Sequence, residues 1–77
     1  MTLEEIQTKL KSGIESSEVT MDGDGCNCSA LVVSPIFNGM SLLERQKAVL
    51  AIVSEEIKSG ELHALSIKAR TPEENAK

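Results

Sequence analysis

Apolar residues recur three or four positions apart near the start of the chain, as on one face of an amphipathic helix. They are Leu3, Ile6, Leu10 and Ile14. Thr2 and Glu5 have the spacing of a capping box, in which each side chain bonds the other residue's backbone N–H. Gly13 suits the C-terminal cap. We therefore predict a first helix over about residues 2–12.

The next pattern has a period of two, which is typical of strands with one buried face. Residues 18–22 alternate between polar and apolar, and residues 30–33 form a short, partly β-branched run before Pro35. Residues 23–25 contain two glycines, which favour a turn because glycine adopts positive φ. The two runs are therefore predicted to pair as a hairpin.

A second helical pattern begins at Ser41, which repeats the capping box with Glu44. We expect one wide apolar face on this helix, made of Leu42, Leu43, Val49, Leu50, Ile52, Val53 and Ile57. Gly60 is predicted to end it, which makes it the longest helix. Residues 63–70 alternate loosely as a third strand, and residues 71–74 read as an N-cap threonine followed by proline at the first position of a further helix.

The predicted order is helix, strand, strand, helix, strand, within a single domain over residues 1–77. The long helix between the second and third strands permits a parallel crossover, and therefore a mixed sheet. We expect an α+β fold with one three-stranded sheet and both main helices packed on one face.

Composition narrows the function classes. The chain has 77 residues, is 40% hydrophobic and has a net charge of −4, which indicates a small globular domain and disfavours sequence-independent nucleic-acid binding. Lys68 and Arg70 could still form a small positive patch. No apolar run approaches the roughly 18 residues that span a bilayer, and the acidic start lacks the pattern of a secretory signal. We expect a cytoplasmic protein.

His63 is the only histidine, and Cys26 and Cys28 are the only cysteines. Thiolate and imidazole are ligands that soft and borderline metals prefer, but these three cannot enclose an ion alone. From the residues alone a hydrogen-bonded His63 is about twice as plausible as a ligand, and a buried, inert Cys28 has roughly an even chance. A bond between cysteines two apart would be strained, so we expect both to be reduced.

Other chemistries fit the sequence poorly. Asp22, Asp24 and Cys26 resemble the start of a calcium loop, but Asn27 and Val33 stand where that loop needs glycine and glutamate. A single histidine without a nucleophile elbow speaks against a serine triad, and the C-x-x-C of redox enzymes is missing. We expect no enzymatic activity.

Three segments together resemble the BolA family. They are residues 26–29 (Cys-Asn-Cys-Ser), residues 37–45, and residues 62–68 continued by Thr-Pro-Glu-Glu at 71–74. The resemblance implies the αββαβ order of a type II KH-like fold. It also implies a [2Fe-2S] cluster bridged with a monothiol glutaredoxin and glutathione, for which His63 and Cys26 match the family's ligand positions.

The function expected from this resemblance is that of a non-enzymatic adaptor in iron–sulfur cluster trafficking or iron sensing. Three residues depart from the family pattern: Met40 replaces a frequent lysine, Arg70 a frequent tyrosine, and Asn75 a frequent tryptophan. The alternative is a transcriptional regulator that binds nucleic acid through the KH-like fold. That alternative ranks lower because the chain is acidic and has no G-x-x-G loop.

Overall fold

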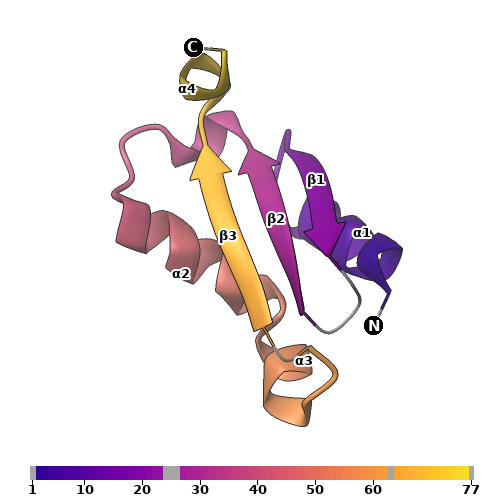
Figure 1. Ribbon diagram of the computed structural model, residues 1–77. Helices are drawn as coiled ribbons and strands as arrows, with labels where there is room; N and C mark the ends of the chain where they lie inside the picture. Colours follow the sequence, from indigo (N-terminus) through magenta and orange to yellow (C-terminus); the bar gives the residue numbers. More distant parts are fainter. Residues whose placement is uncertain (1, 24–26, 63, 77) are drawn as a thin grey trace.

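The computed structural model describes residues 2–23, 27–62 and 64–76, and shows a three-stranded sheet with its main helices on one side (Figure 1). The elements in chain order are α1 (Leu3–Gly13), β1 (Glu18–Gly23), β2 (Asn27–Val33), the 3₁₀ turn η1 (Pro35–Phe37), α2 (Leu42–Ile52), α3 (Ser54–Ser59), β3 (Ala64–Arg70) and α4 (Pro72–Asn75). This arrangement confirms the predicted α+β fold, while the KH-like label stays a prediction. No helix in these ranges is long and apolar enough to cross a membrane.

The strands follow the order β1-β2-β3. β1 and β2 form the predicted antiparallel hairpin, with Glu18 opposite Val33. β2 and β3 are parallel, with Asn27 opposite Ala64 and Val33 opposite Arg70. The predicted mixed sheet is thus confirmed, and the parallel pair is connected by a crossover through α2 and α3.

The hairpin closes tightly at Gly23, which has a φ of +102°. A Cβ at this position would lie 2.6 Å from the Asn27 carbonyl oxygen and 2.8 Å from the Cys28 Cα. Only glycine allows both this positive φ and this close approach of the backbone without strain, because it has no Cβ. The other turn residues that we expected, 24 and 25, lie outside the described residues.

The core lies between the sheet and the helices. Its fully or almost fully buried apolar residues include Ile6, Leu10, Ile14, Ala30, Val32, Phe37, Val49, Val53 and Leu62. α1 supplies Ile6 and Leu10 at the spacing that the sequence predicted. Phe37, the sole aromatic residue, is completely buried, so the remaining volume is filled by aliphatic side chains.

Three helices begin with a reciprocal capping box, at Thr2 and Glu5, at Ser41 and Glu44, and at Thr71 and Glu74. The sequence predicts the first two boxes, and at Thr71 it predicts the N-cap alone. In α2, for example, the Ser41 backbone N–H donates to Glu44 Oε1 (2.8 Å), and the Glu44 N–H donates to Ser41 Oγ (3.1 Å). Each box satisfies backbone donors that a helix start otherwise leaves unpaired. The predicted starts are therefore confirmed.

Gly13 does not cap α1 as predicted. It is the last residue of the helix, and Ile14 is the cap, whose N–H donates to the Leu10 carbonyl oxygen at 3.0 Å. A Cβ on Gly13 would lie only 2.9 Å from Ile52 Cδ1. The missing side chain thus allows the end of α1 to approach α2 closely.

The predicted long helix is interrupted at Val53. The Val53 N–H donates to the Leu50 carbonyl oxygen (3.2 Å), three residues back, and its φ and ψ of −111° and 18° are not helical. Val53 is fully buried, so the break coincides with a β-branched side chain held in the core. α3 then ends at Gly60, whose φ is +86°, as the sequence predicted.

The prediction of the apolar face of α2 is partly wrong. Its buried line runs through Arg45, Val49 and Val53, each four residues after the last. Leu42 and Leu43 are instead 75% and 64% exposed. Each residue turns a helix by about 100°, which puts Leu43 nearly opposite Arg45. A charged side chain therefore occupies a core position that apolar patterning could not assign to it.

Candidate functional site

β2 and β3 begin at the same end of the sheet because they run parallel. Their first residues, Asn27 and Ala64, are register partners. The parallel crossover that the sequence permits thus places these two strand starts side by side. Cys26 and His63 directly precede them in the sequence but lie outside the described residues. Their role as a ligand pair stays a prediction.

The second cysteine, Cys28, lies within the described residues. Cys28 is 8% exposed and belongs to the hydrophobic core cluster. Its neighbours Asn27 and Ser29 are exposed, as the alternation of a strand requires. Burial, one of the two alternatives that the sequence left open for Cys28, is thus what the structure shows. A thiol on this side of the sheet is poorly placed to meet an incoming metal ion.

The start of β2 lies beside a shallow hollow of about 320 Å³. It is lined by Asp22, Gly23, Asn27, Cys28, Ser29 and Ser66. Within residues 2–23, 27–62 and 64–76, no group of three His, Cys, Asp or Glu side chains could hold a metal ion. That finding leaves the predicted pair untested, because both of its members lie outside these ranges.

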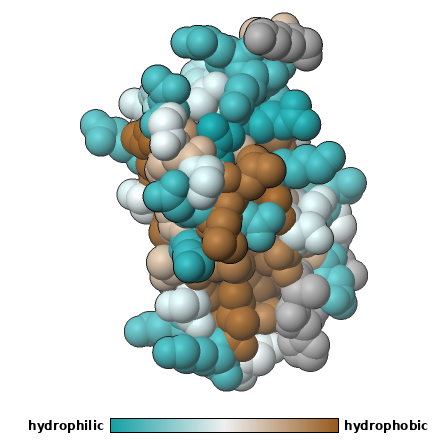
Figure 2. Space-filling model, turned by 90° about the vertical axis from the view of Figure 1, so that its left-hand side faces the viewer, coloured by the Kyte–Doolittle hydropathy of each residue, from teal (hydrophilic) through white to brown (hydrophobic). Residues whose placement is uncertain are grey.

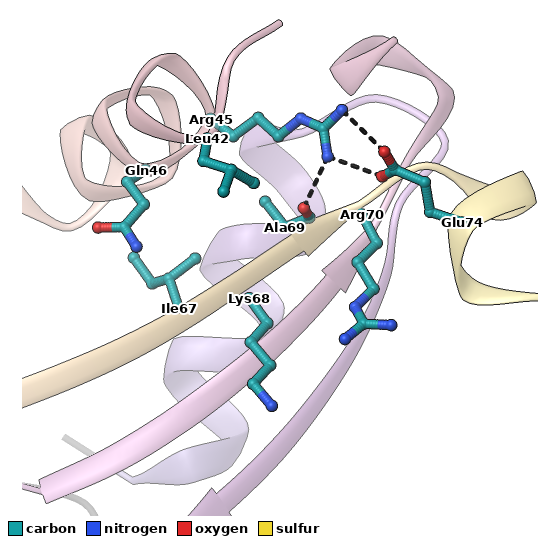
Figure 3. A pocket seen from close by; sticks show the side chains of 8 residues that line it. All are labelled: Leu42, Arg45, Gln46, Ile67, Lys68, Ala69, Arg70 and Glu74. Atoms are coloured by element: carbon teal, nitrogen blue, oxygen red, sulfur yellow. Dashed lines mark hydrogen bonds and ion pairs between the residues drawn. The ribbon is translucent and has the colours of Figure 1, made fainter. Parts of the chain in front are cut away.

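A second hollow, of about 390 Å³, lies between α2 and β3 and is bordered by the Arg45 side chain (Figure 3). The Arg45 side chain is only 8% exposed. Its Nη1 donates to the Ala69 carbonyl oxygen and its Nε to the Met40 carbonyl oxygen, both at 3.1 Å. The guanidinium group therefore joins the start of α2 to the end of β3.

Glu74 neutralises this buried charge. Its Oε1 and Oε2 accept hydrogen bonds from Arg45 Nη1 and Nη2 at 2.7 and 3.3 Å, in the forked geometry typical of arginine and carboxylate. The Arg45 hydrogen bonds, followed by the one from the Thr71 backbone N–H, lower the pKa of Glu74 from 4.5 to about 2. The same carboxylate thus caps α4 and pairs with α2.

Sequence reasoning missed this Arg45–Glu74 pair. The sequence identifies Glu74 and Arg45 only as parts of family-like segments. One signal was available: Arg45 is four residues before Val49, on the line that becomes the buried face of α2. An arginine on the buried face of a helix needs a carboxylate partner, because a buried charge without one is strongly destabilising.

Lys68 and Arg70 are both exposed on the face of β3 that points away from the core. They alternate with Ile67 and Ala69, which pack toward the helices. The expected small positive patch is therefore present on this strand. On the same face of the sheet, Glu18 of β1 is exposed and carries the opposite charge.

Comparison with known proteins identifies the family of this chain. The family model described as BolA-like protein matches residues 6–74. The chain belongs to the BolA-like family. Among curated relatives, the acid stress protein IbaG of Escherichia coli K12 is 38% identical over 73 residues, which cover 95% of this chain and 87% of IbaG.

Solved structures of BolA-like proteins share the fold. A bolA homologue from Coxiella burnetii aligns with a TM-score of 0.89 at 32% identity, covering 100% of this chain and 99% of that one. The BolA domain of SufE1 from Arabidopsis thaliana aligns with a TM-score of 0.81 at 31% identity, covering 94% of this chain and 93% of that domain. The architecture in Figure 1 is thus the family's own.

Proposed function

We propose that this BolA-like protein is a non-enzymatic cytoplasmic adaptor in iron–sulfur cluster trafficking or iron sensing, and that it binds a [2Fe-2S] cluster together with a monothiol glutaredoxin. The observation that carries the proposal is the parallel register of β2 and β3, which begins with Asn27 opposite Ala64. The chain reaches this pair of residues directly after Cys26 and His63. The structural similarity to the BolA domain of SufE1 also supports an iron–sulfur-related role.

The donor chemistry fits an iron–sulfur cluster. Thiolate sulfur and imidazole nitrogen are both established ligands of [2Fe-2S] clusters. Cys26 and His63 would supply two ligands, whereas a [2Fe-2S] cluster takes four. The remaining two would come from the thiols of glutaredoxin and glutathione. The protein alone therefore provides half of a site, which makes cluster binding dependent on the partner.

The test uses the protein mixed with a monothiol glutaredoxin, glutathione, iron and sulfide under anaerobic conditions. Visible absorption and circular dichroism should show a cluster spectrum that differs from that of glutaredoxin alone. His63→Ala should change or abolish this difference, and Cys26→Ser should weaken it. Cys28→Ser is the matched control and should do little, because Cys28 is buried in the core.

Three outcomes would contradict the proposal at different levels. If Cys28 is essential and Cys26 dispensable, the ligand assignment is wrong. If neither His63 nor any cysteine matters, the cluster is not bound at the starts of β2 and β3, and the cluster proposal itself fails. If the mixture only reproduces the spectrum of glutaredoxin, no shared cluster forms.

A nucleic-acid-binding regulator is the second candidate, favoured by exposed Lys68 and Arg70 on one strand. The net charge of −4 and the exposed Glu18 on the same sheet face oppose it. Fluorescence anisotropy with labelled single- and double-stranded oligonucleotides decides the matter. Binding that is tight and steeply dependent on salt would support the regulator.

A further inference from the structure

β3 is an edge strand: in the part of the chain that the structure describes, the sheet ends with it. The Ser34 N–H donates to the Arg70 carbonyl oxygen at 2.9 Å, so the backbone groups of Arg70 face the β2 side. Backbone groups of successive residues point to opposite sides of a strand. Leu65, Ile67 and Ala69 therefore direct their N–H and C=O groups to the outer edge.

Arg45 limits the length of this outer edge. It donates to the Ala69 carbonyl oxygen, which confirms that this oxygen points outward, toward α2. The Ala69 carbonyl oxygen is therefore already hydrogen-bonded and is not available to a strand added along this edge. The stretch open to pairing runs through Leu65 and Ile67 and ends at the Ala69 N–H.

An apolar surface borders the same edge. Leu42, which is 75% exposed, and Ile67 both line the hollow between α2 and β3 (Figure 3). Figure 2, which views the molecule from the side of α2, shows hydrophobic surface gathered in the middle of this side with hydrophilic residues around it. Apolar side chains of an added strand would be buried against Leu42 and Ile67.

The other face of β3 is basic. Lys68 and Arg70 are exposed, and Figure 3 shows them pointing away from α2 and from the Arg45–Glu74 pair. The charge of Arg45 is already neutralised by Glu74. Residues of an added strand that lie opposite Lys68 and Arg70 would be most favourable if acidic, because opposite charges across neighbouring strands attract.

We propose that the outer edge of β3 binds an extended segment of a partner protein in which apolar and acidic residues alternate, and that this segment adds a fourth strand to the sheet. Main-chain hydrogen bonds to Leu65 and Ile67 would give affinity, and the alternating side chains would give specificity. This site is independent of the proposed cluster and needs neither Cys26 nor His63.

A second copy of this chain is a poorer occupant. Pairing two β3 strands about a two-fold axis would bring Lys68 and Arg70 of each copy close to those of the other, and like charges across strands repel. Basic residues on an edge strand are a known protection against such self-pairing. β1 does alternate polar residues, two of them acidic, with apolar ones, but joining it to β3 would build an open chain of molecules.

The test uses a nine-residue synthetic peptide that alternates valine with aspartate, added to the isotope-labelled protein without glutaredoxin. Amide hydrogen exchange by NMR should slow at Leu65, Ile67 and Ala69, whose N–H groups face outward. Exchange at Lys68 should change little, because its N–H faces β2. A peptide with lysine in place of aspartate should bind about tenfold more weakly.

Two pairs of variants separate the apolar and basic contributions. Leu42→Ser should weaken peptide binding about fivefold, whereas Leu43→Ser, on the far side of α2, should not. Lys68→Glu should weaken peptide binding by a similar factor. Lys11→Glu makes the same charge change on α1, away from the outer edge of β3, and should leave peptide binding unchanged. All four positions are exposed or on the helix surface, so folding should persist.

The proposal is overturned if exchange at Ile67 does not slow, if the lysine peptide binds equally well, or if both members of either pair behave alike. Concentration-dependent self-assembly in analytical ultracentrifugation would show that a second copy occupies the edge instead. His63→Ala should leave peptide binding intact, so a failure here and a failure of the cluster proposal are distinguishable.

Discussion

Replacing Arg45 with alanine should destabilise the fold strongly, although Arg45 is charged. Its side chain is 8% exposed, and its guanidinium group donates to two main-chain carbonyl oxygens, those of Met40 and Ala69, at 3.1 Å each. Each hydrogen bond whose acceptor is left unsatisfied costs about 1–2 kcal/mol. Because Glu74 is half exposed, its carboxylate can be rehydrated and adds little to the loss.

The expected loss is therefore about 2–4 kcal/mol, from the two carbonyl groups alone. That is a large share of the roughly 5–15 kcal/mol that stabilises a domain. For a chain of this size it corresponds to a Tm lower by about 10–25 °C. Arg45→Lys should recover only part of the loss, since an ammonium group lacks the planar fork that reaches all three partners.

Urea denaturation followed by far-UV circular dichroism measures this free energy. Arg70→Ala is the matched control: it removes an exposed arginine near the Arg45–Glu74 pair and should change stability by less than about 0.5 kcal/mol. If Arg45→Ala costs no more than Arg70→Ala, the buried hydrogen bonds do not stabilise the fold as argued.

Three further predictions follow from single sites. The folded pKa of Glu74, about 2, lies below the ordinary 4.5, so the stabilisation by its carboxylate is fully present above pH 4.5 and is lost as pH falls toward 2. Midpoints of urea denaturation measured between pH 2 and 6 should show this loss. In Glu74→Gln the midpoint should depend less on pH. Gly23→Ala should destabilise more than Gly39→Ala in thermal denaturation. Both residues have positive φ, but a Cβ meets backbone only at Gly23. Thiol titration of the unfolded protein without reductant should find both Cys26 and Cys28 reduced, and a stable disulfide would contradict this.

The sequence alone determined the local features. The capping boxes at Thr2 and Ser41, and the N-cap Thr71 followed by proline, are local patterns, so they were sufficient to predict where α1, α2 and α4 begin. The alternation in β1 and the glycine at position 23 likewise predicted the hairpin. The crossover helix also permitted the parallel register that brings the starts of β2 and β3 together at the candidate cluster site.

Only the tertiary structure decided which residues meet across the fold. The burial of Arg45 depends on Glu74 and Ala69, which lie 29 and 24 residues away, and no local pattern encodes that meeting. Gly13 is needed for the approach of Ile52, which a helix-end rule cannot show. Leu42 is 75% exposed beside β3, which is the last strand of the sheet in the described part of the chain, and no local pattern shows where a sheet ends. Contacts between distant segments are set by packing, and packing is not a property of any one segment.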